Sequence, residues 1–233
     1  MRVFRLILIM ALGALLYRGG LAAYQSAPFE LKVFEVEGNS GRRVTDEQIV
    51  AAAGVPKGAK LLQVSTRSVV SRISEIPWVA KARVERLLPS KLRINVVERR
   101  PELVVATGQG PYLVDPEGLV LQQGTEDLVQ VSDLPLGELR AGERLTSREF
   151  LNAATIYKSL PRQIRAAVSV ISAPTIDQTV IRTAGGPSIF YGAAEQIEDK
   201  NFALESLYTS SKSTNPGSII DVRVPSRPAI RSS

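Results

Sequence analysis

The sequence predicts an α+β protein with an N-terminal transmembrane helix, a first soluble domain of order β-α-α-β-β, and a mixed β-rich domain with two helices. Three observations support this. An apolar segment opens the chain, two amphipathic helices lie between alternating strands before Pro101, and short strands separated by turns follow it. The chain has 233 residues, of which 44% are hydrophobic. That length suffices for one large or two small domains with hydrophobic cores.

The composition narrows the chemistry that this chain can perform. It contains neither cysteine nor histidine. Disulfides, thiolate nucleophiles and Cys-ligated metals are therefore excluded, and so are the commonest general base and the commonest zinc ligand. Asp, Glu, Lys, Ser and Tyr could still catalyse a reaction. We nevertheless expect a binding or scaffolding protein rather than an enzyme, with no catalytic residue, metal, cofactor or small-molecule substrate.

Residues 6–24 are predicted to anchor the chain in a membrane, after a cytoplasmic tail of residues 1–5. The uninterrupted apolar core, Leu6 to Tyr17, has only 12 residues, but Val3 to Tyr24 has 22 and would extend about 33 Å as a helix. A cleaved signal peptide, with a basic start, a short apolar core and the small residues "GGLAA", is the alternative. In both cases the positive N-terminus stays inside and the bulk is extracytoplasmic, so nucleic acid is not an expected partner.

Residues 29–100 contain the elements of the first soluble domain. The stretch "FELKVFEVEGN" alternates in polarity and ends in a turn pair, as expected of a strand. In "VTDEQIVAAAGV", Thr45 is the predicted N-cap of a helix, Gln48 its capping-box partner and Gly54 its stop. Apolar residues at helical spacing in "STRSVVSRISEIP" predict a second helix, which Pro77 ends.

A strongly basic pair of strands completes this domain. Residues 81–101 carry seven Lys or Arg against two Glu. Both "AKARVERL" and "KLRINVVERRP" alternate in polarity, so the charged residues are interpreted as the solvent face of a half-buried sheet. The residues of the second strand that face inward are Leu92, Ile94 and Val96. Alternatively, some of these arginines form a contact face for a partner or for an anionic wall or lipid.

Residues 101–231 are predicted to form the β-rich domain. The stretch "PYLVDPEGLVLQ" predicts a hairpin, and Asp115 and Glu117 are interpreted as residues of its turn rather than as a catalytic pair. The helices are predicted in "SREFLNAATIYKSLP" and "AAEQIEDKNFALESLYTSSK", with three strand candidates between them. The final stretch "GSIIDVRVPSRPAIR" alternates like a strand, which Pro225 and Pro228 interrupt.

The order of these elements and their motifs resemble a POTRA domain, specifically the one in the FtsQ/DivIB family of bacterial cell-division proteins. The resemblance rests on "FEVEGN", "LLQVSTRSVVSRISEIPWVAKARVERLLPSKLRINVVERRP" and "YLVDPEGLVL", which extend in the same order over residues 34–121. It implies a single-pass type II protein of the cytoplasmic (inner) membrane, located at the division septum. Its extracytoplasmic part would be a POTRA domain at 29–100 and a β-domain at 101–231.

By this resemblance the protein is a non-enzymatic division scaffold. It would bind FtsB-like (DivIC-like) and FtsL-like proteins by adding a strand at its C-terminal edge, and so connect early division proteins to the septal peptidoglycan synthases. The candidate partner-binding residues on the C-terminal edge strand are Val222, Arg223, Val224, Ser226 and Ile230. The candidate contact face of the POTRA domain consists of Arg83, Arg93 and Arg99.

Three other functions compete with this one. A POTRA-containing module for polypeptide export or envelope assembly would need several POTRA repeats, and the sequence shows one. An extracytoplasmic hydrolase would need convergent acids outside turns and helix caps, and none is evident. An extracytoplasmic wall-binding or phospholipid-binding protein would use the basic hairpin, and charge reversal at the three POTRA arginines would separate it from the scaffold.

Overall fold

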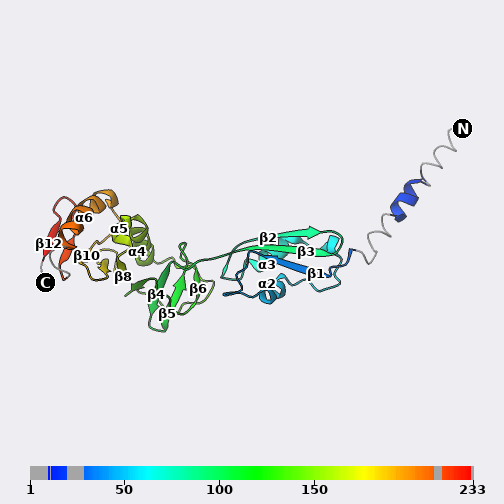
Figure 1. Cartoon of the computed structure of the whole chain (residues 1–233), viewed down its shortest axis with the longest axis horizontal. Helices are drawn as coiled ribbons and strands as arrows, with labels where there is room; N and C mark the ends of the chain where they lie inside the picture. The colour runs from blue at the N-terminus through cyan, green and yellow to red at the C-terminus, as the bar shows by residue number, and fades with distance from the viewer. Residues whose placement is uncertain (1–9, 11, 20–28, 213–216, 232–233) are drawn as a thin grey trace. The chain divides into compact units, whose positions relative to one another are not determined.

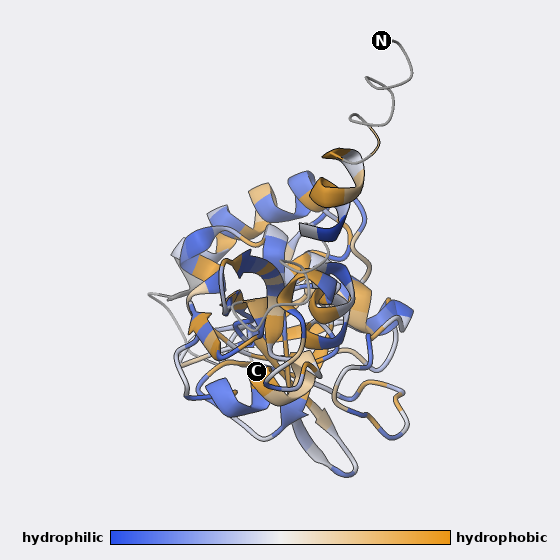
Figure 2. Ribbon diagram, turned by 90° about the vertical axis from the view of Figure 1, so that its right-hand side faces the viewer, coloured by the Kyte–Doolittle hydropathy of each residue, from blue (hydrophilic) through white to orange (hydrophobic). Residues whose placement is uncertain are grey.

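The computed structural model describes residues 10, 12–19, 29–212 and 217–231. Contacts divide the chain into two compact units, residues 1–99 and 100–233 (Figure 1). Residues 12–19 are helical, and Figure 2 colours most of this helix as hydrophobic. Within the described part of the chain, no helix has both the length and the apolar character that crossing a membrane requires. The predicted tail and much of the predicted anchor, residues 6–24, lie outside the described residues.

Residues 29–99 of the first unit contain a three-stranded sheet and two α-helices, in the predicted order β-α-α-β-β. Its elements are β1 (Val33–Glu37), α2 (Asp46–Ala53), the 3-10 helix η2 (Leu61–Gln63), α3 (Thr66–Ile73), β2 (Val79–Leu87) and β3 (Lys91–Glu98). The strand order is β1-β3-β2, in which β1 runs parallel to β3 and β2 runs antiparallel to it. Strand β3 is therefore the central strand, with its hairpin partner β2 on one side and β1 on the other.

The boundaries of α2 follow from its end residues. The Thr45 hydroxyl accepts a hydrogen bond from the Gln48 N–H at 3.3 Å, and the Gln48 side chain accepts one from the Thr45 N–H at 2.9 Å. This reciprocal pair satisfies two donors that a helix start leaves open. Gly54 ends the helix in the left-handed conformation, with φ of 60°. Arg72 of α3 donates to the Ala53 carbonyl there, which ties the two helices together.

The core of the first unit lies between the sheet and the two helices. Leu92 and Ile94 of β3 are fully buried and Val96 is nearly so, as the alternation predicted. The helices contribute Ile49 and Ile73, which are also fully buried. Because alternate residues of a strand point to opposite faces, Lys91 and Arg93 of β3 lie on the solvent face of the sheet.

The second unit is built on one nine-stranded sheet. Its strands are β4 (Leu103–Thr107), β5 (Gly110–Val114), β6 (Val120–Gln123), β7 (Val129–Ser132), β8 (Val168–Ser172), β9 (Val180–Thr183), β10 (Ser188–Phe190), β11 (Ile219–Asp221) and β12 (Ala229–Arg231). The strand order is β12-β11-β10-β9-β8-β7-β4-β5-β6. The helices are α4 (Arg148–Ser159), the single-turn α5 (Arg162–Arg165) and α6 (Ile197–Lys212). The sequence did not indicate β7 or α5.

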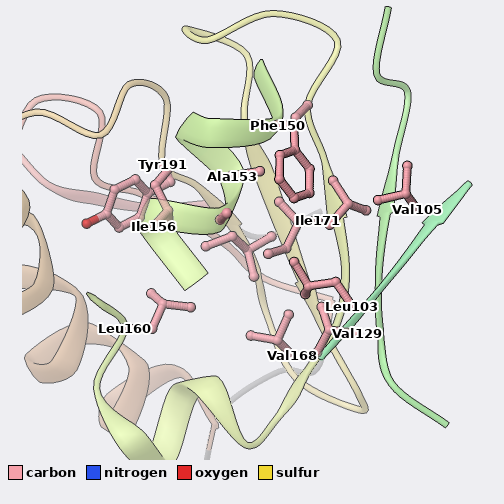
Figure 3. Close-up of a cluster of buried hydrophobic side chains, with 14 of the residues drawn as sticks. Leu103, Val105, Val129, Phe150, Ala153, Ile156, Leu160, Val168, Ile171 and Tyr191 are labelled. Atoms are coloured by element: carbon pink, nitrogen blue, oxygen red, sulfur yellow. The ribbon is translucent and has the colours of Figure 1, made fainter. Parts of the chain in front are cut away.

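The core of the second unit lies between the sheet and helices α4 and α6. Figure 3 shows Phe150 and Ile156 of α4 among apolar side chains that include Val105 and Ile171 of the sheet. Leu204 of α6 belongs to the same buried cluster. Helix α4 starts at a cap, because the Ser147 hydroxyl accepts a hydrogen bond from the Phe150 N–H at 3.2 Å. The helices therefore cover one face of the sheet. On the other face, Val104 of β4 and Leu113 of β5 are also buried.

The acidic turn between β5 and β6 is structural. One carboxylate oxygen of the buried Asp115 accepts hydrogen bonds from the N–H groups of Glu117 at 2.9 Å and Leu119 at 2.8 Å. Gly118 has φ of 83°, and a Cβ there would lie 3.3 Å from the Leu145 carbonyl oxygen. Among the described residues, no group of acids is arranged to hold a metal ion.

Candidate partner-binding edge

The C-terminal segment folds into a short hairpin rather than into one long strand. Strands β11 and β12 pair antiparallel, with Ile220 opposite Ile230. Between them, the Arg227 N–H donates to the Val224 carbonyl at 3.0 Å. Pro225 occupies the second position of this turn, where its fixed φ is favourable.

The hairpin corrects the expectation that five candidate residues share one edge strand. Of the five, only Ile230 lies on β12. Val222 is fully buried just beyond β11, and Arg223, Val224 and Ser226 lie in the connection. The expectation was wrong because the turn at Pro225 ends the alternating pattern of the stretch, so that a second strand begins only at Ala229.

The hydrogen bonds of β11 determine which backbone groups of β12 face outward. The Val222 N–H donates to the Phe190 carbonyl, and the Ser188 N–H donates to the Ser218 carbonyl, both at 3.0 Å. The backbone N–H and C=O groups of even-numbered residues in β11 therefore point to β10, and those of odd-numbered residues point to β12. The reason is that the backbone groups of successive residues in a strand point in opposite directions. It follows that Ile230, opposite Ile220, directs its N–H and C=O away from β11. No strand of the described chain pairs with this outer edge.

A bidentate ion pair holds the start of the connection. The Arg223 guanidinium donates to the Asp221 carboxylate, with Nη2 to Oδ2 at 2.6 Å and Nε to Oδ1 at 3.0 Å. These hydrogen bonds from Arg223 lower the pKa of Asp221, and the same bonds raise the pKa of Arg223. The guanidinium also lies 5.5 Å from the ring centroid of Phe190. The pair fixes the direction in which the chain leaves β11.

An apolar groove lies beside this edge, between α6 and the connection. It has a volume of about 710 Å³. It is lined by Gln196, Asp199, Phe202, Ala203, Ser206, Leu207, Val224, Pro225, Ser226 and Pro228. Phe202 is 80% exposed and Val224 is 56% exposed. Large apolar side chains this exposed around one hollow are typical of a surface that binds another molecule.

Two buried polar side chains of the helices hold the loop before α6. The Asn152 side chain of α4 accepts a hydrogen bond from the Ala194 N–H at 2.7 Å and donates to the Thr179 hydroxyl at 2.9 Å and the Gly192 carbonyl at 3.3 Å. Because the Ala194 N–H and the Gly192 carbonyl both pair with the Asn152 amide, the network fixes the loop from which α6 starts. The sequence offered a weak signal for this role, since Asn152 is a polar residue at a core position of a helix.

Lys200 of α6 fastens the same loop from the other side. Only 3% of its surface is exposed, and its ammonium group donates to the carbonyls of Ala193 at 2.8 Å and Tyr191 at 3.1 Å. Burial lowers the pKa of Lys200. Because α6 forms one wall of the groove, Asn152 and Lys200 act on the groove indirectly, by positioning that wall.

The three candidate arginines of the POTRA domain do not form one basic face. Arg83 is exposed on β2, whereas Arg93 of β3 forms ion pairs with Glu35 at 3.3 Å and Glu37 at 3.2 Å. Glu85 lies directly opposite Arg93 on β2. Acids therefore alternate with bases on the outer face of this sheet, which weakens its attraction for an anionic surface.

Arg99 lies apart from the other two candidates. It follows the end of β3 and is half-buried, and its N–H donates to the Trp78 carbonyl at 2.7 Å. The Trp78 ring is buried, and the Arg43 guanidinium lies 4.8 Å from its centroid. These contacts give the segment around Trp78 and Arg99 a role in closing the core of the first unit.

The β-α-α-β-β unit at residues 33–98 places the chain in the class of POTRA-containing proteins. Comparison with protein families agrees, because residues 29–99 match the model of the POTRA domain, FtsQ-type. Similarity to curated proteins extends over most of the chain. The chain is similar to the cell-division proteins of the FtsQ/DivIB family over most of its length, as its motifs predicted.

Three of the relatives are cell division proteins named FtsQ. Cell division protein FtsQ of Mycolicibacterium smegmatis is 30% identical over 226 residues, which cover 97% of this chain and 62% of that protein. The protein of the same name from Streptomyces coelicolor is 29% identical over 235 residues, which cover 97% of this chain and 87% of that protein. The one from Corynebacterium glutamicum is 26% identical over 179 residues, which cover 76% of this chain and 78% of that protein. The chain thus spans less than two thirds of the length of the Mycolicibacterium smegmatis protein and more than two thirds of the length of the other two.

Proposed function

We propose that this chain is a non-enzymatic scaffold of bacterial cell division, anchored in the cytoplasmic membrane with its bulk outside the cytoplasm. Its second unit binds FtsB-like (DivIC-like) and FtsL-like partners, and it thereby connects early division proteins to the enzymes that build the septum. The partner adds an extended segment to the outer edge of β12. The observation that carries this proposal is the open edge at Ile230 beside an exposed apolar groove.

The edge and the groove are complementary in what they offer a partner. The outward N–H and C=O of Ile230 supply main-chain hydrogen bonds, which give affinity without regard to sequence. The groove between α6 and the connection accepts apolar side chains, which add specificity. The three relatives support the division role, since each is named a cell division protein.

Ile230→Pro tests the edge without dismantling the hairpin. Proline at this position removes only the outward N–H, and proline is tolerated on an edge strand where the N–H faces solvent. The bonds between β11 and β12 use residues 229 and 231, so they remain. We expect the full chain carrying Ile230→Pro, purified in mild detergent, to capture at least about tenfold less FtsB-like partner than the unchanged chain.

Ile230→Ala is the matched control for this measurement. It shortens the same side chain, which is 44% exposed, but keeps the outward N–H. We expect Ile230→Ala to retain most of the capture. Equal capture by the proline variant and the unchanged chain, with both variants folded by circular dichroism, would show that the partner does not use this edge.

A further inference from the structure

We propose that the edge of β12 selects an extended segment in which apolar side chains alternate with carboxylates. This inference rests on the proposed strand addition and names the chemistry of the segment that is added. It follows from the small number of outward backbone groups on β12, from the different character of the two faces beside it, and from the arginines on one of those faces.

The backbone of β12 alone offers a partner little. The strand has three residues, Ala229 to Arg231, and of these only Ile230 directs its N–H and C=O outward. Pro228, just before the strand, has no N–H to donate. Because each main-chain hydrogen bond contributes only about 1 kcal/mol net, side chains must supply most of the affinity and the choice of partner.

The two faces of the sheet differ in character at this edge. Ile230 points to the same face as its opposite residue Ile220, which is buried against the helices. The groove with Phe202 and Val224 lies on that helix-covered side, next to α6. A residue of the added strand that lies directly opposite Ile230 would therefore place its side chain beside apolar surface.

The residues flanking that position would point to the other face, which is basic. A second hollow of about 290 Å³ on this side is lined by Asp221, Arg223, Val224, Arg227, Ala229 and Arg231. Asp221 is already engaged by Arg223 through two hydrogen bonds. Within the described residues, the Arg227 guanidinium has no ion-pair partner. This face therefore keeps an excess of positive charge at the sheet edge.

Carboxylates at those flanking positions would complement the arginines. A side chain opposite Arg231 on an added strand lies within reach of a cross-strand ion pair, and Arg227 lies in the same hollow. Both arginines are exposed, so each pair contributes modestly, up to about 1 kcal/mol. Two such pairs together would change the affinity about tenfold, which is enough to choose among segments with the same apolar residues.

Three synthetic peptides test this preference against the full chain in mild detergent. In all three, valine and phenylalanine occupy alternate positions, and the positions between them are Glu, Gln or Lys. We expect fluorescence anisotropy at low salt to show the Glu peptide binding about tenfold more tightly than the Gln peptide, and the Lys peptide binding more weakly than both. High salt should reduce the difference, because it screens exposed charges.

The double variant Arg227→Glu/Arg231→Glu provides the charge-swapped comparison. We expect it to reverse the order, so that the Lys peptide binds best. Equal affinities for the Glu and Gln peptides would overturn the charge preference. The preference would also be overturned if the double variant bound the three peptides in the same order of affinity as the unchanged chain. Neither result would argue against strand addition. Failure of all three peptides to bind would overturn this inference. Strand addition itself is tested separately, by comparing how much partner the Ile230→Pro and Ile230→Ala variants capture.

Discussion

Asn152→Leu is expected to lower the free energy of unfolding of the second unit by about 3 kcal/mol. Leucine branches at the same carbon as asparagine, but it would leave the Ala194 N–H, the Gly192 carbonyl and the Thr179 hydroxyl without the amide that they now contact. Each buried polar group that loses its partner costs about 1–3 kcal/mol. Urea unfolding followed by circular dichroism measures the loss.

Leu151→Ala on the same helix is the matched control for this variant. Leu151 is 48% exposed, so its truncation should change the free energy of unfolding by no more than about 0.5 kcal/mol. If Asn152→Leu cost no more than Leu151→Ala, the loop before α6 would be held by other contacts. The network would then have no part in positioning the groove.

Leu92→Ala is expected to destabilise the POTRA domain by about 3 kcal/mol. The side chain of Leu92 is fully buried between the sheet and the two helices, and truncation would remove its contacts and leave a cavity. Trp78, the only tryptophan of the chain, is buried in this unit, so its fluorescence reports the unfolding of the POTRA domain directly.

Val97→Ala on the same strand is the comparison for Leu92→Ala. Val97 is 56% exposed on the opposite face of β3, and its truncation should leave the midpoint of the tryptophan transition almost unchanged. Similar losses from the two variants would mean that the two faces of β3 are not buried and exposed as the structure has them.

The POTRA domain could be predicted from sequence because its signals are local. Thr45, Gln48 and Gly54 define one helix through contacts within a few residues, and the alternation of β3 identifies the buried face without knowledge of the partner strands. The parallel pairing of β1 with β3 joins segments nearly 60 residues apart, and no local pattern specifies it. The same limit applies to β7, a four-residue strand placed centrally in the second sheet.

The binding edge was only partly predictable for a related reason. The alternation of Ile220, Val222 and Val224 suggested a strand that Pro225 and Pro228 interrupt, whereas β11 already ends at Asp221 and a second strand begins at Ala229. The direction of the Ile230 N–H depends on which residues of β11 face β10, a property of the assembled sheet. The groove likewise lies between α6 and the terminal connection, two segments that come together only in the folded chain. The sequence did not indicate that Phe202 is exposed, because α6 contains other apolar residues.

Hydrogen exchange at the Ile230 amide is the sharpest test of strand addition to β12. The full chain in mild detergent is labelled with ¹⁵N, and amide exchange is followed by NMR with and without the FtsB-like partner. The amides of Ala229 and Arg231 already bond to β11, so the partner should change them little. If an added strand pairs with β12, the Ile230 amide, exposed in the free chain, will exchange far more slowly in the complex. An unchanged exchange rate at Ile230 in a formed complex would show that the partner does not pair with β12.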